Sequence, residues 1–82
     1  AYVALGMNKP EIAPLANIKV PVLDLYGQDD LPEVTANAAL RKTTAEKNSH
    51  YTQVVTKNAD HFFNGQEEAL VSVVDNWLQD NL

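Results

Sequence analysis

The chain has no cysteine and comparatively few basic residues. Without cysteine, the 82 residues can form no disulfide, no thiolate metal site and no cysteine nucleophile. Six lysines and arginines stand against eleven aspartates and glutamates, which gives a formal net charge of -5, and the basic residues are scattered along the chain. Because nucleic acids and anionic membrane surfaces attract clustered positive charge, we expect the chain to bind neither.

Long apolar runs are also missing. No run approaches the roughly 20 residues that a transmembrane helix requires, so the sequence predicts no membrane span. A chain of 82 residues is long enough for one domain at most, and a domain of that size has a small hydrophobic core. We therefore expect a single unit, residues 1–82, that has no disulfide to stabilise it.

The stretch from Ile18 to Asp30 (IKVPVLDLYGQDD) is the most informative part of the sequence. Its centre is a nearly continuous apolar run that ends at Gly27, which is typical of a strand buried on both faces. Asp24 interrupts the run, and we expect its carboxylate to bond to neighbouring backbone or to a basic side chain, because a buried charge needs a partner. Gly27 permits a sharp turn or the close approach of another segment, and Asp29 and Asp30 follow it.

The rest of the chain alternates between strand and helix patterns. Runs of β-branched residues predict strands, and amphipathic periodicity predicts helices. The expected elements are a strand at Ala1 to Leu5, an irregular connection at Met7 to Asn17 with one helical turn at Glu11 to Ala16, a helix at Leu31 to Lys47, a strand at Tyr51 to Thr56 and a helix at Gln66 to Asn81. This alternation predicts an α/β fold with a parallel three-stranded sheet in βαβα order.

Both predicted helices have a face that suits packing on a sheet. In the first helix, small side chains share one face and allow close packing on a flat surface, at Ala36, Ala39, Leu40 and Thr43. In the last helix, apolar pairs recur every four residues and include Trp77. A large aromatic side chain on such a stripe is expected in the hydrophobic core.

Acidic residues and a histidine follow two neighbouring strands of the predicted sheet. Asp29 and Asp30 follow the first of these strands, and Asp60 and His61 follow the strand at Tyr51 to Thr56. Because parallel strands have their carboxyl ends at the same edge of a sheet, we expect the two loops to meet there. A carboxylate that orients a histidine is half of a nucleophilic triad, since it fixes the tautomer and stabilises the imidazolium.

Other interpretations of these residues are open at the level of sequence. Asp29, Asp30, Asp60 and His61 could together bind a divalent cation, since carboxylates and imidazole are metal ligands. Alternatively, the loop acids cap the following helix, and His61 is a structural loop residue. His50, the second histidine, begins the strand at the opposite end of the sheet from His61 and is expected on the surface.

The segments VPVLDLYGQDD and YTQVVTKNADHFF, followed by an amphipathic helix, resemble the C-terminal third of an α/β-hydrolase. The similarity is to the dienelactone-hydrolase-like and prolyl-oligopeptidase-like branches and to related bacterial hydrolases of unassigned substrate. It implies that Asp30, or its neighbour Asp29, is the triad acid and that His61 is the catalytic histidine. It also implies hydrolysis of a small-molecule ester or acyl substrate without a cofactor. Asn58 stands where the family often has glycine.

The nucleophile elbow of this superfamily, G-x-S-x-G, does not occur in the chain. The two serines are Ser49, at a predicted helix end, and Ser72, inside the last helix. We therefore expect the C-terminal fragment of an α/β-hydrolase domain, which holds the acid and the histidine and is inactive alone. The alternative function is a non-catalytic module that self-associates or binds a partner through an exposed sheet edge.

Overall fold

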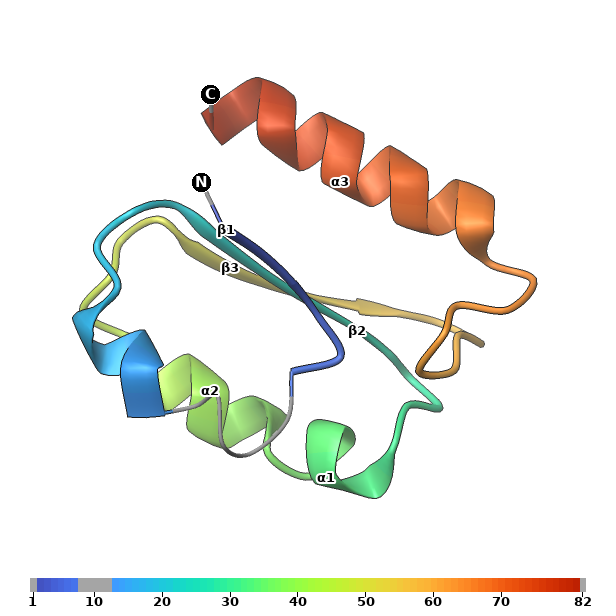
Figure 1. Ribbon diagram of the computed structural model, residues 1–82, viewed down its shortest axis with the longest axis horizontal. Helices are drawn as coiled ribbons and strands as arrows, with labels where there is room; N and C mark the ends of the chain where they lie inside the picture. The colour runs from blue at the N-terminus through green and yellow to red at the C-terminus, as the bar shows by residue number, and fades with distance from the viewer. Residues whose placement is uncertain (1, 8–12, 82) are drawn as a thin grey trace.

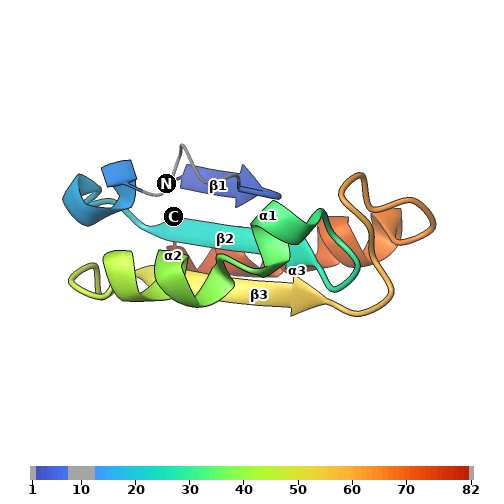
Figure 2. The same ribbon diagram turned by 90° about the horizontal axis from the view of Figure 1, so that it is seen from below.

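A computed structural model describes residues 2–7 and 13–81 of the chain. It shows a parallel three-stranded sheet with helices on both faces, which is an α/β architecture (Figure 1). In chain order the elements are β1 (Tyr2–Leu5), the 3-10 helix η2 (Ala13–Asn17), β2 (Val22–Gly27), α1 (Pro32–Thr35), α2 (Ala38–Thr44), β3 (Tyr51–Thr56) and α3 (Glu67–Asn81). α3 covers one face of the sheet, whereas η2, α1 and α2 lie on the other (Figure 1, Figure 2).

The three strands lie in the order β1-β2-β3, and both neighbouring pairs are parallel, as predicted. Parallel neighbours need a crossover between them. Here the segment with η2 connects β1 to β2, and α1 with α2 connects β2 to β3. In the register, Leu25 of β2 lies between Leu5 of β1 and Val54 of β3. The carboxyl ends of all three strands are therefore at one edge of the sheet.

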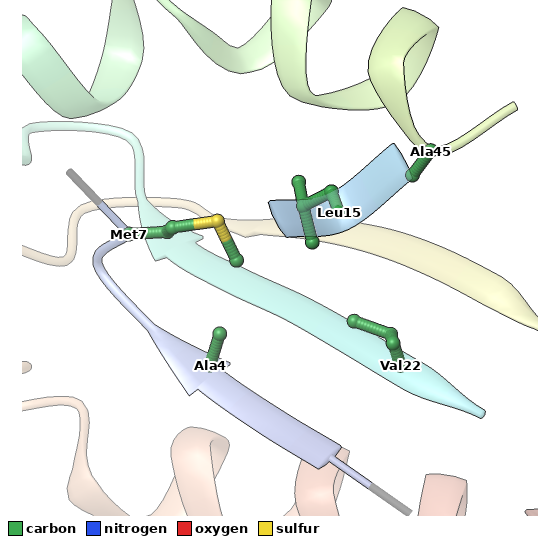
Figure 3. Close-up of a cluster of buried hydrophobic side chains, with 5 residues drawn as sticks. All are labelled: Ala4, Met7, Leu15, Val22 and Ala45. Atoms are coloured by element: carbon green, nitrogen blue, oxygen red, sulfur yellow. The ribbon is translucent and has the colours of Figure 1, made fainter. Parts of the chain in front are cut away.

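β2 is the buried centre of the sheet, as its apolar sequence predicts. Successive side chains point to opposite faces, so β2 contributes to two hydrophobic clusters. The cluster on the side of η2 and α2 contains Ala4, Met7, Leu15, Val22 and Ala45 (Figure 3). The cluster on the α3 side contains Leu23, Leu25, Ala59, Phe63 and Trp77. The prediction that Trp77 is a core residue is confirmed, because only 7% of it is exposed.

The prediction of one continuous helix from Leu31 to Lys47 is wrong, because the segment forms two short helices. α1 ends at Thr35 and α2 begins at Ala38. In an uninterrupted helix the carbonyl of Glu33 would accept the backbone N–H of Asn37. It accepts the side-chain Nδ2 of Asn37 instead, at 2.6 Å. Asparagine competes with the backbone in this way, and the competition interrupts the helix.

The face of this segment that packs on the sheet also differs from the prediction. The small side chains expected to pack are exposed, at Ala36, Ala39, Leu40 and Thr43. The buried side chains are those of Val34, Ala38, Arg41 and Ala45. A charged residue, Arg41, lies at the centre of the buried stripe. A prediction that assigns the apolar residues of a helix to its buried face cannot identify such a stripe, and the predicted face is therefore wrong.

Arg41 is buried because it pairs with Asp24 beneath the sheet. Its Nε donates to Asp24 Oδ2 at 2.7 Å, and neither side chain is exposed to solvent. The hydroxyl of Tyr51 and the amide of Gln53 donate to the same carboxylate oxygen. Buried ions need several partners of this kind to offset their lost hydration. Of the two partners expected for Asp24, neighbouring backbone or a basic side chain, the basic side chain is the one observed.

The remaining predicted boundaries agree with the structure to within a few residues where it describes them. The strand at Ala1 to Leu5 is observed as β1, with Ala1 outside the described residues. The helical turn at Glu11 to Ala16 corresponds to η2, and residues 11 and 12 are likewise outside the described part. In the described ranges 2–7 and 13–81, no helix has the length and apolar character needed to cross a bilayer.

Candidate functional site

The loops that follow β2 and β3 lie against each other at the carboxyl edge of the sheet, at the right-hand end of Figure 1. Hydrogen bonds join their backbones, from Gln28 N to Thr56 O and from Asp29 N to Ala59 O, both at 2.9 Å. Gly27 makes this contact feasible, since a Cβ atom there would lie 2.2 Å from the Ala59 carbonyl oxygen. Of the two roles that glycine suggested, the close approach is therefore the one observed. The predicted meeting of the two loops is confirmed.

Asp30 is held in this junction by backbone donors. Its Oδ2 accepts the N–H of Gly27 at 3.2 Å, and its Oδ1 accepts the N–H of Leu31 at 2.7 Å. The Asp30 side chain has no exposed surface. It does not cap the following helix, because the N-cap position of α1 is Leu31, which makes no side-chain cap. Two oriented N–H groups and burial fix the direction of this carboxylate.

His61 meets the same carboxylate from the other loop. Its Nδ1 lies 2.7 Å from Asp30 Oδ1, and a quarter of the His61 side chain is exposed. An ionised carboxylate can only accept, so this contact requires the ring proton on Nδ1. Within the described part of the chain, Nε2 has no hydrogen-bond partner. In a neutral ring with this proton, Nε2 is the nitrogen that can accept a proton.

Two further residues contact the His61 ring, and neither was identified from the sequence. Gly6, at the carboxyl end of β1, lies so close that an added Cβ would be 2.6 Å from His61 Cε1. Phe62 packs edge-on against the ring, with the centroids 5.1 Å apart, and is 78% exposed. The one available signal for Gly6 is its place at the end of a parallel strand, where ligands of open α/β sheets bind.

Asp29 and Asp60 lie in the same loops, but in the described structure neither carboxylate makes a hydrogen bond to the His61 ring. Asp29 is exposed, which resolves the sequence ambiguity in favour of Asp30 as the partner of the histidine. Asp60 Oδ1 accepts the N–H groups of Phe62 and Asn64, and its Oδ2 accepts the Asn64 side chain. These bonds, those from Asn64 above all, hold the pKa of Asp60 below its usual value. Asp60 therefore shapes the turn that carries the histidine.

The proposed divalent-cation site is not assembled in the structure. Of the four residues considered, only Asp30 and His61 come together. Across residues 2–7 and 13–81, no group of three or more His, Cys, Asp or Glu side chains is placed to hold a metal ion. His50 is exposed, as predicted, and its carbonyl accepts the N–H of Val22 at the amino end of β2, opposite to His61.

Asn58 in the histidine loop has a φ angle of 60°. This left-handed conformation is the one that glycine adopts without strain and that asparagine tolerates better than most other residues. Asparagine is therefore compatible with the backbone conformation at this position. The same loop places Phe63, with φ of 56°, in the core below α3, which anchors the loop.

Neither serine of the chain is near this site. Ser49 lies in the turn before β3, at the amino edge of the sheet, and Ser72 is exposed on α3. The site as described is a partly exposed histidine whose Nδ1 faces a buried carboxylate, and its Nε2 is the nitrogen that a proton donor can approach. Comparisons of the chain with protein-family models, with curated proteins and with solved structures find no match.

Proposed function

We propose that Asp30 and His61 are the acid and the base of a catalytic triad, and that the chain is the C-terminal part of an α/β-hydrolase domain. The observation that carries this proposal is the 2.7 Å contact between His61 Nδ1 and Asp30 Oδ1 at the carboxyl edge of a parallel sheet. The order of acid before histidine, each after its own strand, is the order of that superfamily. The proposed reaction is hydrolysis of an ester or a related acyl compound.

In this reaction His61 Nε2 accepts the proton of a hydroxyl nucleophile as that oxygen attacks the acyl carbon. Asp30 then stabilises the imidazolium through Nδ1–H, and its two backbone donors keep the carboxylate in place. His61 then returns the proton to the leaving group as its bond to the acyl carbon breaks, and the same two transfers with water as the attacking group release the acid from the nucleophile. The nucleophile has to come from a segment outside these 82 residues, because neither Ser49 nor Ser72 is near His61. No step needs a cofactor.

The hydrogen bond at the centre of this proposal is tested by ¹⁵N NMR of the imidazole rings. The wild-type chain should show His61 as the Nδ1–H tautomer, with exposed His50 as an internal reference. Asp30→Asn should abolish the preference, because an amide can donate to Nδ1 and so favours the wrong tautomer. Asp29→Asn changes the exposed neighbour and should leave the signals unchanged. A wild-type His61 spectrum like that of His50 would contradict the proposed dyad.

The catalytic role is tested with the same two variants in a longer product that contains the 82 residues and a G-x-S-x-G segment. Asp30→Asn should lower kcat by roughly 10⁴-fold, as loss of a triad acid does, and Asp29→Asn should change it little. The 82-residue chain alone should not hydrolyse activated esters or react with an active-serine probe. Labelling of Ser49 or Ser72, or equal losses in the two variants, would refute the assignment.

A second candidate function is self-association, which a separate feature of the surface favours. β1 is an edge strand in the described structure, and Tyr2, Val3 and Leu5 are 36–49% exposed. A groove of about 380 Å³ runs between β1 and α3 and is lined mainly by apolar side chains. Free strand edges and apolar grooves both favour association.

A further inference from the structure

The His61 ring packs directly on the backbone of Gly6. A Cβ atom built on Gly6 would lie 2.6 Å from Cε1 and 2.7 Å from Nδ1 of His61, and 3.4 Å from Asp30 Oδ2. The first two distances are far shorter than carbon atoms tolerate, so no side chain fits between residue 6 and the ring. Gly6, the residue that follows β1, therefore forms a surface of the site.

The backbone at Gly6 is held in place and cannot retreat from an added side chain without cost. Gly6 N donates to Leu25 O at 2.9 Å, which ties it to β2. The next residue, Met7, is buried in the cluster beneath the sheet, and its carbonyl accepts Nη1 of Arg41 at 3.4 Å. Gly6 also has a φ angle of +60°, a conformation that favours glycine.

A hydrogen bond at Nδ1 alone leaves the imidazole free to tilt about that contact. Packing of Cε1 against Gly6 removes this freedom, and it does so beside Nε2, the nitrogen that has to face a nucleophile. Sites that need a defined proton acceptor lose rate when such a group is misplaced by about 1 Å. We propose that Gly6 is a positioning residue for His61, required because it has no side chain. The role of Gly6 in catalysis depends on the proposed triad.

Gly65 provides a matched control for the substitution. Gly6 and Gly65 both have left-handed φ angles, +60° and +76°, so alanine at either position has to adopt an unfavourable backbone conformation. The two sites differ in their surroundings, since a Cβ at Gly65 would have no atom within 4 Å. Gly65→Ala therefore measures the backbone effect alone, and Gly6→Ala measures that effect together with displacement of the ring.

The experiment records imidazole ¹⁵N spectra of the 82-residue chain and its two variants, with His50 as an internal reference. Gly6→Ala should convert the His61 pattern from the Nδ1–H tautomer to a mixture like that of His50, and Gly65→Ala should leave it unchanged. Unchanged His61 signals in folded Gly6→Ala would overturn the proposal. A wild-type chain without the Nδ1–H pattern would refute the Asp30–His61 dyad itself, which separates the two failures.

A stability cycle keeps the test decisive where Gly6→Ala unfolds the chain. His61→Ala removes the ring that the new methyl group would meet. In the His61→Ala background, Gly6→Ala should lower the urea midpoint no more than Gly65→Ala does. In the wild-type background, Gly6→Ala should lower the midpoint more than Gly65→Ala does. Equal losses from Gly6→Ala in both backgrounds, including failure of both variants to fold, would show that the ring is not what residue 6 accommodates.

Discussion

At the scale of single residues, Asp24 of β2 and Asp30 of the following loop show how environment gives two carboxylates different roles. Asp24 lies in the interior, where it is paired with Arg41 and accepts the hydroxyl of Tyr51. Asp30 is held by backbone N–H groups at the sheet edge and accepts from His61. The first carboxylate joins the sheet to α2, and the second leaves a partly exposed imidazole able to accept protons. In the proposed function, Asp30 and not Asp24 takes part in the chemistry.

The burial of Tyr51 beside Asp24 should make the stability of the fold sensitive to alkaline pH. Burial, and then the hydrogen bond to Asp24 and its charge, raises the pKa of Tyr51 above the usual value of tyrosine, about 10. Below that pH both the folded and the unfolded chain keep the phenol proton, so the contribution to stability is complete. Above it the unfolded chain releases the proton first, and the free energy of unfolding should fall as pH rises.

This expectation is checked by urea unfolding at a series of pH values between about 8 and 11, with Tyr51→Phe as the matched variant. Phenylalanine cannot ionise, so its stability should depend less steeply on pH over the upper part of the range. Tyrosinate absorbance of the wild-type chain should also show a tyrosine that ionises above the usual range, and Tyr51→Phe should remove that step. Identical pH dependence in the two proteins would contradict the role given to the Tyr51 hydroxyl.

The sequence allows the meeting of the Asp29/Asp30 loop and the His61 loop to be predicted, because the spacing of the two loops follows from topology. One crossover and one strand between two loops of a parallel sheet place them at the same edge. The choice between Asp29 and Asp30 is beyond sequence reasoning, since it depends on which carboxylate the Gly27 and Leu31 N–H groups hold. The Gly6 contact is not predictable either, because it joins two residues far apart in the chain that share no pattern.

At the scale of elements, α3 is the clearest prediction and α2 the poorest. The stripe of α3 is apolar throughout, so periodicity alone identifies the side that packs on the sheet. The stripe of α2 contains Arg41, whose burial depends on Asp24 seventeen positions earlier in the chain. Local patterns carry no information on such a pairing. Elements that pack through apolar contacts are therefore predictable here, and the one that packs through an ion pair is not.

The packing of α3 should account for much of the stability of the sheet. Trp77 is 7% exposed and belongs to the cluster with Leu23, Leu25 and Phe63. Trp77→Ala should destabilise the chain by about 3–5 kcal/mol, the usual cost of deleting a buried large aromatic side chain. Val71→Ala, on the exposed side of the same helix, should cost less than about 0.5 kcal/mol. Urea denaturation of both variants measures the difference.

A similar loss in the two variants would mean that α3 contributes through helix formation and not through its contact with the sheet. The site adds a second readout, because Phe63 anchors the His61 loop in the same cluster. In Trp77→Ala, the His61 loop should therefore exchange its amide protons faster than the core of β2 does.

At the scale of the whole molecule, helices cover both faces of the sheet, and within residues 2–7 and 13–81 no further strand pairs with β1 or β3. Each cluster is small, since the buried hydrophobic residues divide between the two faces of a three-stranded sheet. β1 presents an edge next to the apolar groove under α3, and β3 presents the other edge. Asp30 and His61 lie at the carboxyl ends of the strands instead, so association through the free side of β1 or β3 should leave His61 exposed.

The β1 edge should therefore make the chain self-associate without affecting the site. Sedimentation at increasing protein concentration should show a rising average mass, and Val3→Lys should reduce it, because a charged side chain on an edge strand opposes pairing. Val55→Lys places the same charge at an exposed valine of the opposite edge strand and should leave the mass unchanged, since the apolar groove adjoins only β1. A monomer at every concentration, or equal effects of the two lysines, would show that the groove beside β1 drives no association of this chain.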